Sequence, residues 1–112
     1  MIISMENEIF DACGSYRLGQ LEDTDFATIV KSFGEPTITD VSADEKVTCE
    51  WNLTFEMEDG RFIQATIYDY KSDVDFSENT RWSIGGFDER AVFCVTSVLY
   101  LDNDFKKLVE GV

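Results

Sequence analysis

Apolar residues recur with a helical period over residues 24–33. Four of them fall at i, i+3, i+4 and i+7 and so share one stripe of a helix: Phe26, Ile29, Val30 and Phe33. Asp23 or Thr24 is expected to cap the first free amides, and Gly34 is expected to end the helix. The pattern therefore predicts an amphipathic helix.

Apolar and polar residues alternate over residues 47–57, which predicts a strand with one buried face. Asp59-Gly60 is a turn signal, and residues 62–70 are expected to return as an antiparallel strand. A two-residue loop would set apolar against polar side chains on both faces. A three-residue loop over 58–60, with Gly60 left-handed in a bulge, gives one continuous apolar face. It pairs Phe55 with Ile63, Leu53 with Ala65, and Trp51 with Ile67, so the sequence favours it.

The opposite face of this hairpin mixes carboxylates, amides and aromatic rings. It carries Glu50, Asn52, Thr54 and Glu56 on the first strand, and Phe62, Gln64, Thr66, Tyr68 and Tyr70 on the second. Two interpretations stay open. Either a helix or the N-terminal segment covers part of this face and buries the rings, or the face is exposed and suited to binding Arg and Lys through ion pairs and cation–π contacts.

The remaining pattern completes an α+β fold of one domain over residues 1–112. Residues 71–80 read as a mobile acidic loop, residues 81–84 as a strand ended by Gly85-Gly86, and residues 89–100 as a helix capped by Asp88, with a further helical turn near 104–109. Residues 92–101 are also rich in strand formers, so a strand there stays open. We expect an antiparallel sheet of three to four strands around the hairpin 47–57/62–70, packed against helices 24–33 and 89–100.

Charge is the strongest compositional signal, because 23 Asp and Glu against nine Lys and Arg give a net −14. Such a field attracts cationic partners and disfavours direct binding to nucleic acid or to an anionic membrane. Solubility alone is the competing explanation for acidity. No apolar run is long enough to span a bilayer, and the N-terminus lacks a basic region before its apolar residues, so a cytoplasmic protein is expected.

Three cysteines, Cys13, Cys49 and Cys94, are too few and too widely spaced to indicate a disulfide framework or a zinc site. Buried reduced thiols are the simpler expectation. The odd number, together with exposed aromatic rings, also permits a homodimer.

No catalytic machinery is apparent in the chain. The absence of histidine excludes Ser-His-Asp and Cys-His sites, and no phosphate loop or dinucleotide fingerprint occurs. Residues 73–77 resemble the start of a calcium loop, but Glu78 stands where glycine is needed and Ile84 where a bidentate Glu belongs. Glu56 and Glu58 are candidates for a pair of carboxylates in acid–base catalysis, but they lie near a turn, where solvent would keep both ionised. We therefore expect no catalytic residue, no metal and no cofactor.

The order of segments resembles that of small uncharacterised acidic proteins of phages and prophages. The segments are the helix followed by Phe33-Gly34-Glu35-Pro36, the tryptophan strand over residues 50–55, the glycine hairpin, residues 65–71 and Trp82-Ser83-Ile84-Gly85-Gly86. The resemblance spans residues 26–92. It implies an accessory protein of the host-defence inhibitor type, such as an anti-CRISPR or anti-restriction factor.

The favoured hypothesis is a non-enzymatic inhibitor whose carboxylates mimic a nucleic acid and occupy a basic nucleic-acid-binding surface on a host protein or protein–nucleic acid effector complex. Alternate strand residues lie about 6.6 Å apart, so residues 50, 52, 54 and 56 lay polar groups in a row. The expected partner-binding residues are Glu50, Glu56, Glu58, Asp59, Tyr68, Asp69, Tyr70, Asp73, Asp75 and Glu78. An immunity protein against a basic nuclease toxin, and a ligand-binding or accessory subunit with incidental acidity, are the alternatives.

Overall fold

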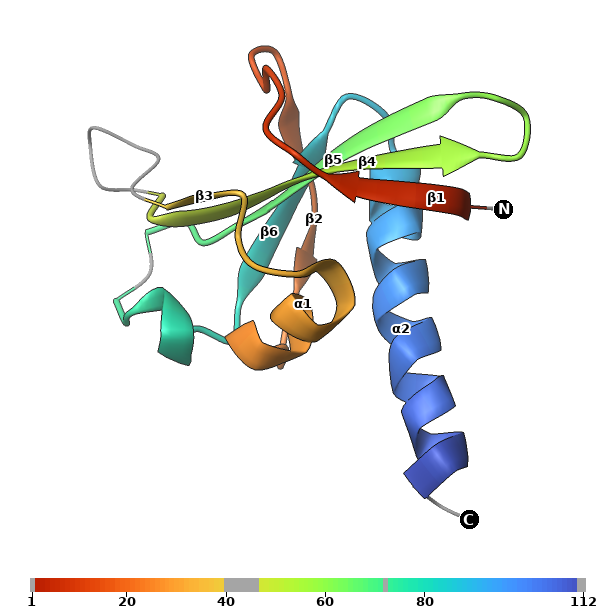
Figure 1. The fold of residues 1–112 in the computed structure, drawn as a ribbon. Coiled ribbons are helices and arrows are strands. Elements are labelled where there is room, and N and C mark those ends of the chain that lie inside the picture. The colour runs from red at the N-terminus through yellow and green to blue at the C-terminus, as the bar shows by residue number, and fades with distance from the viewer. Residues whose placement is uncertain (1, 40–46, 72, 111–112) are drawn as a thin grey trace.

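The computed structural model describes residues 2–39, 47–71 and 73–110, the last ten as backbone alone. Its elements in chain order are β1 (Ile2–Asn7), β2 (Tyr16–Leu21), α1 (Phe26–Phe33), β3 (Ile38–Thr39), β4 (Cys49–Met57), β5 (Phe62–Tyr68), the short 3-10 helix η1 (Phe76–Glu78), β6 (Trp82–Gly86) and α2 (Arg90–Glu110). The strands form one antiparallel sheet in the order β1-β4-β5-β6-β2, with β3 beside β4 (Figure 1). The α+β class is thus confirmed.

The sheet has six strands, so the expected three to four is too low. The missed strands are β1, β2 and β3. The pairing of β1 shifts register between Ile2 and Ser4, and that of β2 shifts between Arg17 and Gly19. Because such a bulge breaks the period of two, these strands show no clean alternation in the sequence. The third, β3, has only two residues.

The central hairpin has the predicted register. Phe55 pairs with Ile63, Leu53 with Ala65, and Trp51 with Ile67. Gly60 has a φ of 86° at the end of the three-residue loop, and the amide of Met57 donates to the carbonyl of Arg61 at 2.9 Å. The resulting apolar face is fully buried.

Both helices pack on this apolar face and lie on the same side of the sheet in Figure 1. The indoles of Trp51 and Trp82 meet edge to face, with ring centroids 5.3 Å apart. Each indole N–H is satisfied next to α1, since Trp51 Nε1 donates to the Gly34 carbonyl at 2.9 Å and Trp82 Nε1 to the Thr24 carbonyl at 2.8 Å. These two bonds attach both ends of α1 to the sheet.

Helix α1 begins two residues later than predicted and has a different cap. Asp25 is the N-cap, and its Oδ1 accepts from the hydroxyl of Thr28 and from its amide, the latter at 2.8 Å. The hydroxyl first, and then the amide, lowers the pKa of Asp25. Thr24 instead bonds to the segment that precedes β6, since its amide donates to the Thr80 carbonyl at 3.1 Å. The end at Gly34 is as predicted, with a φ of 88°.

Helix α2 settles the choice for residues 92–101 in favour of helix. Asp88 accepts from the amide of Arg90 at 2.9 Å, as expected of a capping residue. The helix continues to Glu110, beyond the predicted end at residue 100, because no Gly or Pro interrupts the chain before Gly111.

Gly85 and Gly86 are the last two residues of β6, so the strand ends two residues later than predicted. A Cβ on Gly86 would lie 3.0 Å from the Cβ of Ala91, so glycine here lets α2 approach the sheet. Residues 37–46 are polar and their sequence predicts a solvated connection; it contains β3, and residues 40–46 lie outside the described part of the chain. None of the helices in the described ranges has the length and apolar content needed to cross a bilayer.

Candidate functional site

The sheet face opposite the helices, here called the open face, is divided by one connection. Strands β1 and β2 form opposite edges of the sheet, so the segment between them must cross a face. Figure 1 shows it on the side away from both helices, and the amide of Phe10 donates to Asn52 Oδ1 at 3.2 Å. Asn52 and Thr66 are buried in this region. The open face is therefore split into two exposed halves.

This crossing decides between the two interpretations of the open face. The N-terminal connection does cover its middle, but Phe62 remains 65% exposed and Tyr70 51% exposed, while Tyr68 is half-buried. The predicted polar row along β4 is interrupted, because Asn52 lies at 0% exposure between Glu50 and Glu56. A continuous line of groups mimicking a nucleic acid backbone along β4 is thus ruled out by burial.

One exposed half lies at the hairpin turn, and we call it the tip patch: Glu6, Glu56, Glu58, Asp59 and Phe62. Cross-strand pairing aligns Ser4, Glu56 and Phe62 in one row and places Glu6 in the next. Ser4 Oγ donates to Glu56 Oε1 at 3.1 Å, which orients that carboxylate. The exposed Phe62 ring therefore lies opposite Glu56, with Glu6, Glu58 and Asp59 at the same end of the hairpin.

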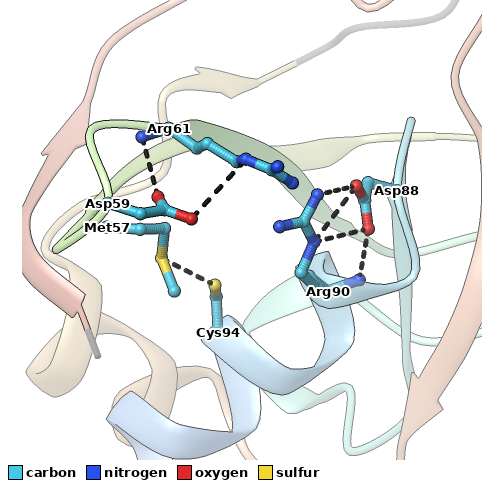
Figure 2. Close-up of polar contacts among 6 residues, drawn as sticks. All are labelled: Met57, Asp59, Arg61, Asp88, Arg90 and Cys94. Atoms are coloured by element: carbon cyan, nitrogen blue, oxygen red, sulfur yellow. Dashed lines mark hydrogen bonds and ion pairs between the residues drawn. The ribbon is translucent and has the colours of Figure 1, made fainter.

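Two separate ion pairs lie near each other beside the tip patch, one in the hairpin and one at the start of α2 (Figure 2). Asp59 pairs with Arg61 at 3.5 Å, and Asp88 pairs with Arg90 at 2.6 Å. Hydrogen bonds from Arg90 lower the pKa of Asp88 to about 2, and Arg61 adds to this effect. Arg61 and Arg90, with Phe62 and Phe87, line a hollow of about 590 Å³ beside the patch.

The ten predicted partner-binding residues do not form one group. Glu56, Glu58 and Asp59 lie at the hairpin turn. Glu50 and the six predicted residues within 68–78 lie at or beyond the other end of β4 and β5. Eight residues of extended β4 separate these ends by about 26 Å. One compact partner contact cannot be centred on both ends equally.

Asp69 is a structural residue, which corrects its assignment to a partner surface. It is 1% exposed, and its Oδ1 accepts from the amides of Thr48 and Cys49, both at 2.8 Å. Its Oδ2 accepts from the Thr48 hydroxyl. The side chain therefore holds the start of β4 against the end of β5.

Glu50 and Tyr68 face each other across the strands and are only partly accessible. Burial raises the pKa of Glu50, and the hydrogen bond that it accepts from Asn52 Nδ2 at 2.7 Å opposes this shift. Burial also raises the pKa of the Tyr68 hydroxyl, with Arg17 acting in the opposite direction. Neither group is freely exposed to a partner.

The segment expected to be a mobile acidic loop has an ordered part. Phe76 packs on Phe26 with ring centroids 5.3 Å apart, and Asp75 caps η1 by accepting from the amide of Ser77 at 3.0 Å. Asp73, Asp75 and Glu78 are exposed, as predicted. Two apolar residues in a polar stretch, Val74 and Phe76, leave no periodic signal, which is why the sequence pattern did not predict this anchor.

The cysteines differ in their surroundings. Cys49 and Cys94 are buried, as expected, but Cys13 is exposed in the crossing connection. Burial, followed by the nearby charge of Asp69, raises the pKa of Cys49 to about 12, and burial raises that of Cys94. Cys94 Sγ lies 3.8 Å from Met57 Sδ (Figure 2).

Glu6 was not among the predicted site residues, because only the pairing of β1 with β4 brings it to the open face. Among the residues that the structure describes, no three His, Cys, Asp or Glu side chains cluster in a way that could hold a metal ion. Comparison of the chain with protein-family models, curated proteins and solved structures gives no match.

Proposed function

We propose that this chain is a non-enzymatic acidic protein that binds and inhibits a basic, nucleic-acid-binding protein. In this proposal the partner belongs to a phage host's defence system, as with anti-CRISPR factors, and the tip patch is the contact surface. The observation that carries it is the 65% exposed Phe62, paired across the strands with Glu56, in a chain of net charge −14.

The tip patch has the composition of an anchored interface. Exposed aromatic rings bordered by polar groups are typical centres of binding energy. A ring can also receive an Arg or Lys side chain through a cation–π contact, while Glu56 and Glu58 supply charge-assisted hydrogen bonds to the same cation. A basic surface rich in Arg and Lys is therefore the complementary partner.

Inhibition follows from competition for that basic surface. A surface that binds nucleic acid presents cations spaced for phosphates, and the carboxylates of the tip patch would neutralise the same cations. The long-range field of the remaining acidic residues would accelerate encounter and make binding depend on salt. In this proposal a local acidic cluster, the tip patch, mimics the nucleic acid. The row of polar groups along β4 does not, because the buried Asn52 interrupts it.

The test is affinity capture from a host lysate at about 0.1 M and about 1 M salt, where screening lengths fall from about 10 to 3 Å. Each captured protein is identified and assayed for nucleic acid binding with and without the chain. We expect a basic nucleic-acid-binding protein that is released at high salt and that loses its nucleic acid when the chain is added. Simultaneous binding of the chain and nucleic acid would contradict the proposal.

Matched variants locate the contact. The double variant Glu56→Gln/Glu58→Gln and the variant Phe62→Ser should lose capture. The control variant Asp73→Asn/Asp75→Asn also removes two negative charges, but at the opposite end of the sheet, and should retain capture of the partner. Equal weakening by both double variants would mean that only net charge matters, and loss in the Asp73/Asp75 variant alone would place the contact at the other end.

The identity of the captured protein separates the alternatives. A basic nuclease toxin would favour an immunity protein, which relies on the same charge complementarity. A partner held equally well at both salt concentrations would favour an accessory subunit with incidental acidity.

A further inference from the structure

The second exposed half of the open face contains a cavity of about 510 Å³ between β2, β6 and the segment that follows β5. Its lining includes Arg17, Lys71 and Arg81, and we call it the cationic pocket. Tyr70, Gln20 and Ser83 also line it, as do the carboxylates Asp73 and Glu78. It lies at the end of the sheet opposite the tip patch.

The pocket gathers cations in a chain that has few of them. Six Lys and Arg side chains are described, and three of the six line this one cavity. The ion pairs among the described residues are Asp59–Arg61 and Asp88–Arg90. Arg17, Lys71 and Arg81 therefore pair with no carboxylate in the described part of the chain, although the whole sequence holds 23 Asp and Glu.

Uncharged groups support these three residues. Arg17 Nη2 donates to Gln20 Oε1, and Lys71 Nζ lies 5.5 Å from the centre of the Tyr70 ring. The buried side chain of Asn79 holds the backbone of Arg81, with Nδ2 donating to its carbonyl at 2.6 Å and Oδ1 accepting from its amide at 3.3 Å. Such contacts orient the side chains or their backbone without neutralising the charges.

We propose that the cationic pocket binds a small organic phosphate. Two guanidinium groups and an ammonium group supply charge-assisted donors of the kind that phosphate oxygens accept, and arginine binds such oxygens in a two-pronged geometry. Asp73 and Glu78 accept hydrogen bonds from hydroxyl or amino groups on the organic part. The volume lies within the range of pockets that hold ligands of nucleotide size.

This site is independent of the tip patch. About 26 Å of β4 separates the two ends of the hairpin, and the crossing connection lies between the two halves of the face. A chain that has lost partner capture can still bind phosphate, and the reverse also holds.

The test is a titration of the full chain with inorganic phosphate, AMP and adenosine at constant ionic strength, followed by backbone amide NMR shifts. Inorganic phosphate and AMP should produce saturable shifts at the amides of Gln20, Lys71 and Arg81, with AMP binding more tightly. Adenosine, which lacks the phosphate, should produce none. Absence of saturable shifts with inorganic phosphate and AMP would overturn the proposal.

Charge-matched variants complete the experiment. Arg17→Gln and Arg81→Gln should each weaken binding about tenfold or more, the usual effect of losing a hydrogen bond to a charged group. Lys31→Gln removes one positive charge from the exposed side of α1, remote from the pocket, and should leave binding unchanged. Equal weakening by Lys31→Gln would overturn the site, and thermal melts confirm that each variant is folded.

Discussion

Replacing Asp69 with alanine removes the acceptor for three donors where β4 begins. The amides of Thr48 and Cys49 both donate to Asp69 Oδ1 at 2.8 Å, and the Thr48 hydroxyl donates to Oδ2. A buried donor left unpaired costs about 1–3 kcal/mol. Cys49 is fully buried and Thr48 half-buried, so we expect a loss of about 2–5 kcal/mol from the free energy of unfolding.

Urea unfolding followed by tryptophan fluorescence measures this loss, because Trp51 and Trp82 are buried in the core and report its exposure. Asp69→Asn is the companion variant, since its amide oxygen can accept both backbone donors. It should cost only about 1 kcal/mol, the share due to charge assistance. Asp73→Ala is the exposed control and should stay within about 0.5 kcal/mol of the native chain.

An Asp69→Ala variant as stable as Asp73→Ala would refute the structural assignment of Asp69. It would mean that solvent replaces the carboxylate at the amides of residues 48 and 49. Asp69 would then return to the set of residues available to a partner, as its charge in the sequence suggested.

Three further predictions test the surroundings of single residues. Because burial raises the pKa of Glu50, ionising this carboxyl group opposes folding. The variant Glu50→Gln should therefore gain stability relative to the native chain as pH rises from about 4.5. A difference in urea midpoint that stays constant between about pH 4 and pH 7 would contradict this. In the native state only Cys13 should react quickly with a thiol reagent, while Cys49 and Cys94 should react after unfolding, and a count of reacted thiols over time checks it. Gly60→Ala should lower the free energy of unfolding in urea by about 1–2 kcal/mol, because φ at this position is 86°. No neighbouring atom lies within 4 Å of the added Cβ, so the cost comes from backbone strain alone. An unchanged urea midpoint would be inconsistent with the left-handed turn.

Local patterns in the sequence were sufficient to predict the register of the central hairpin, and the apolar stripe and C-terminal end of α1, although not its N-cap. The alternation along β4 and the glycine at position 60 select one register, because a one-residue slip would turn every apolar side chain to the other face. The apolar stripe of α1 and the glycine that ends it depend on neighbours within a few residues. Net charge, too, is a property of the sequence alone.

Tertiary structure decided which polar residues are accessible. The sequence shows Asn52, Asp69 and Glu6 simply as polar positions, but the connection from one sheet edge to the other buries Asn52, and the start of β4 encloses Asp69. Pairing of β1 with β4 brings Glu6 beside the hairpin, and β2 brings Arg17 to the same pocket as Arg81. These contacts join residues up to about 60 positions apart, and since bulges hide β1 and β2 from a period of two, no local signal could have placed them.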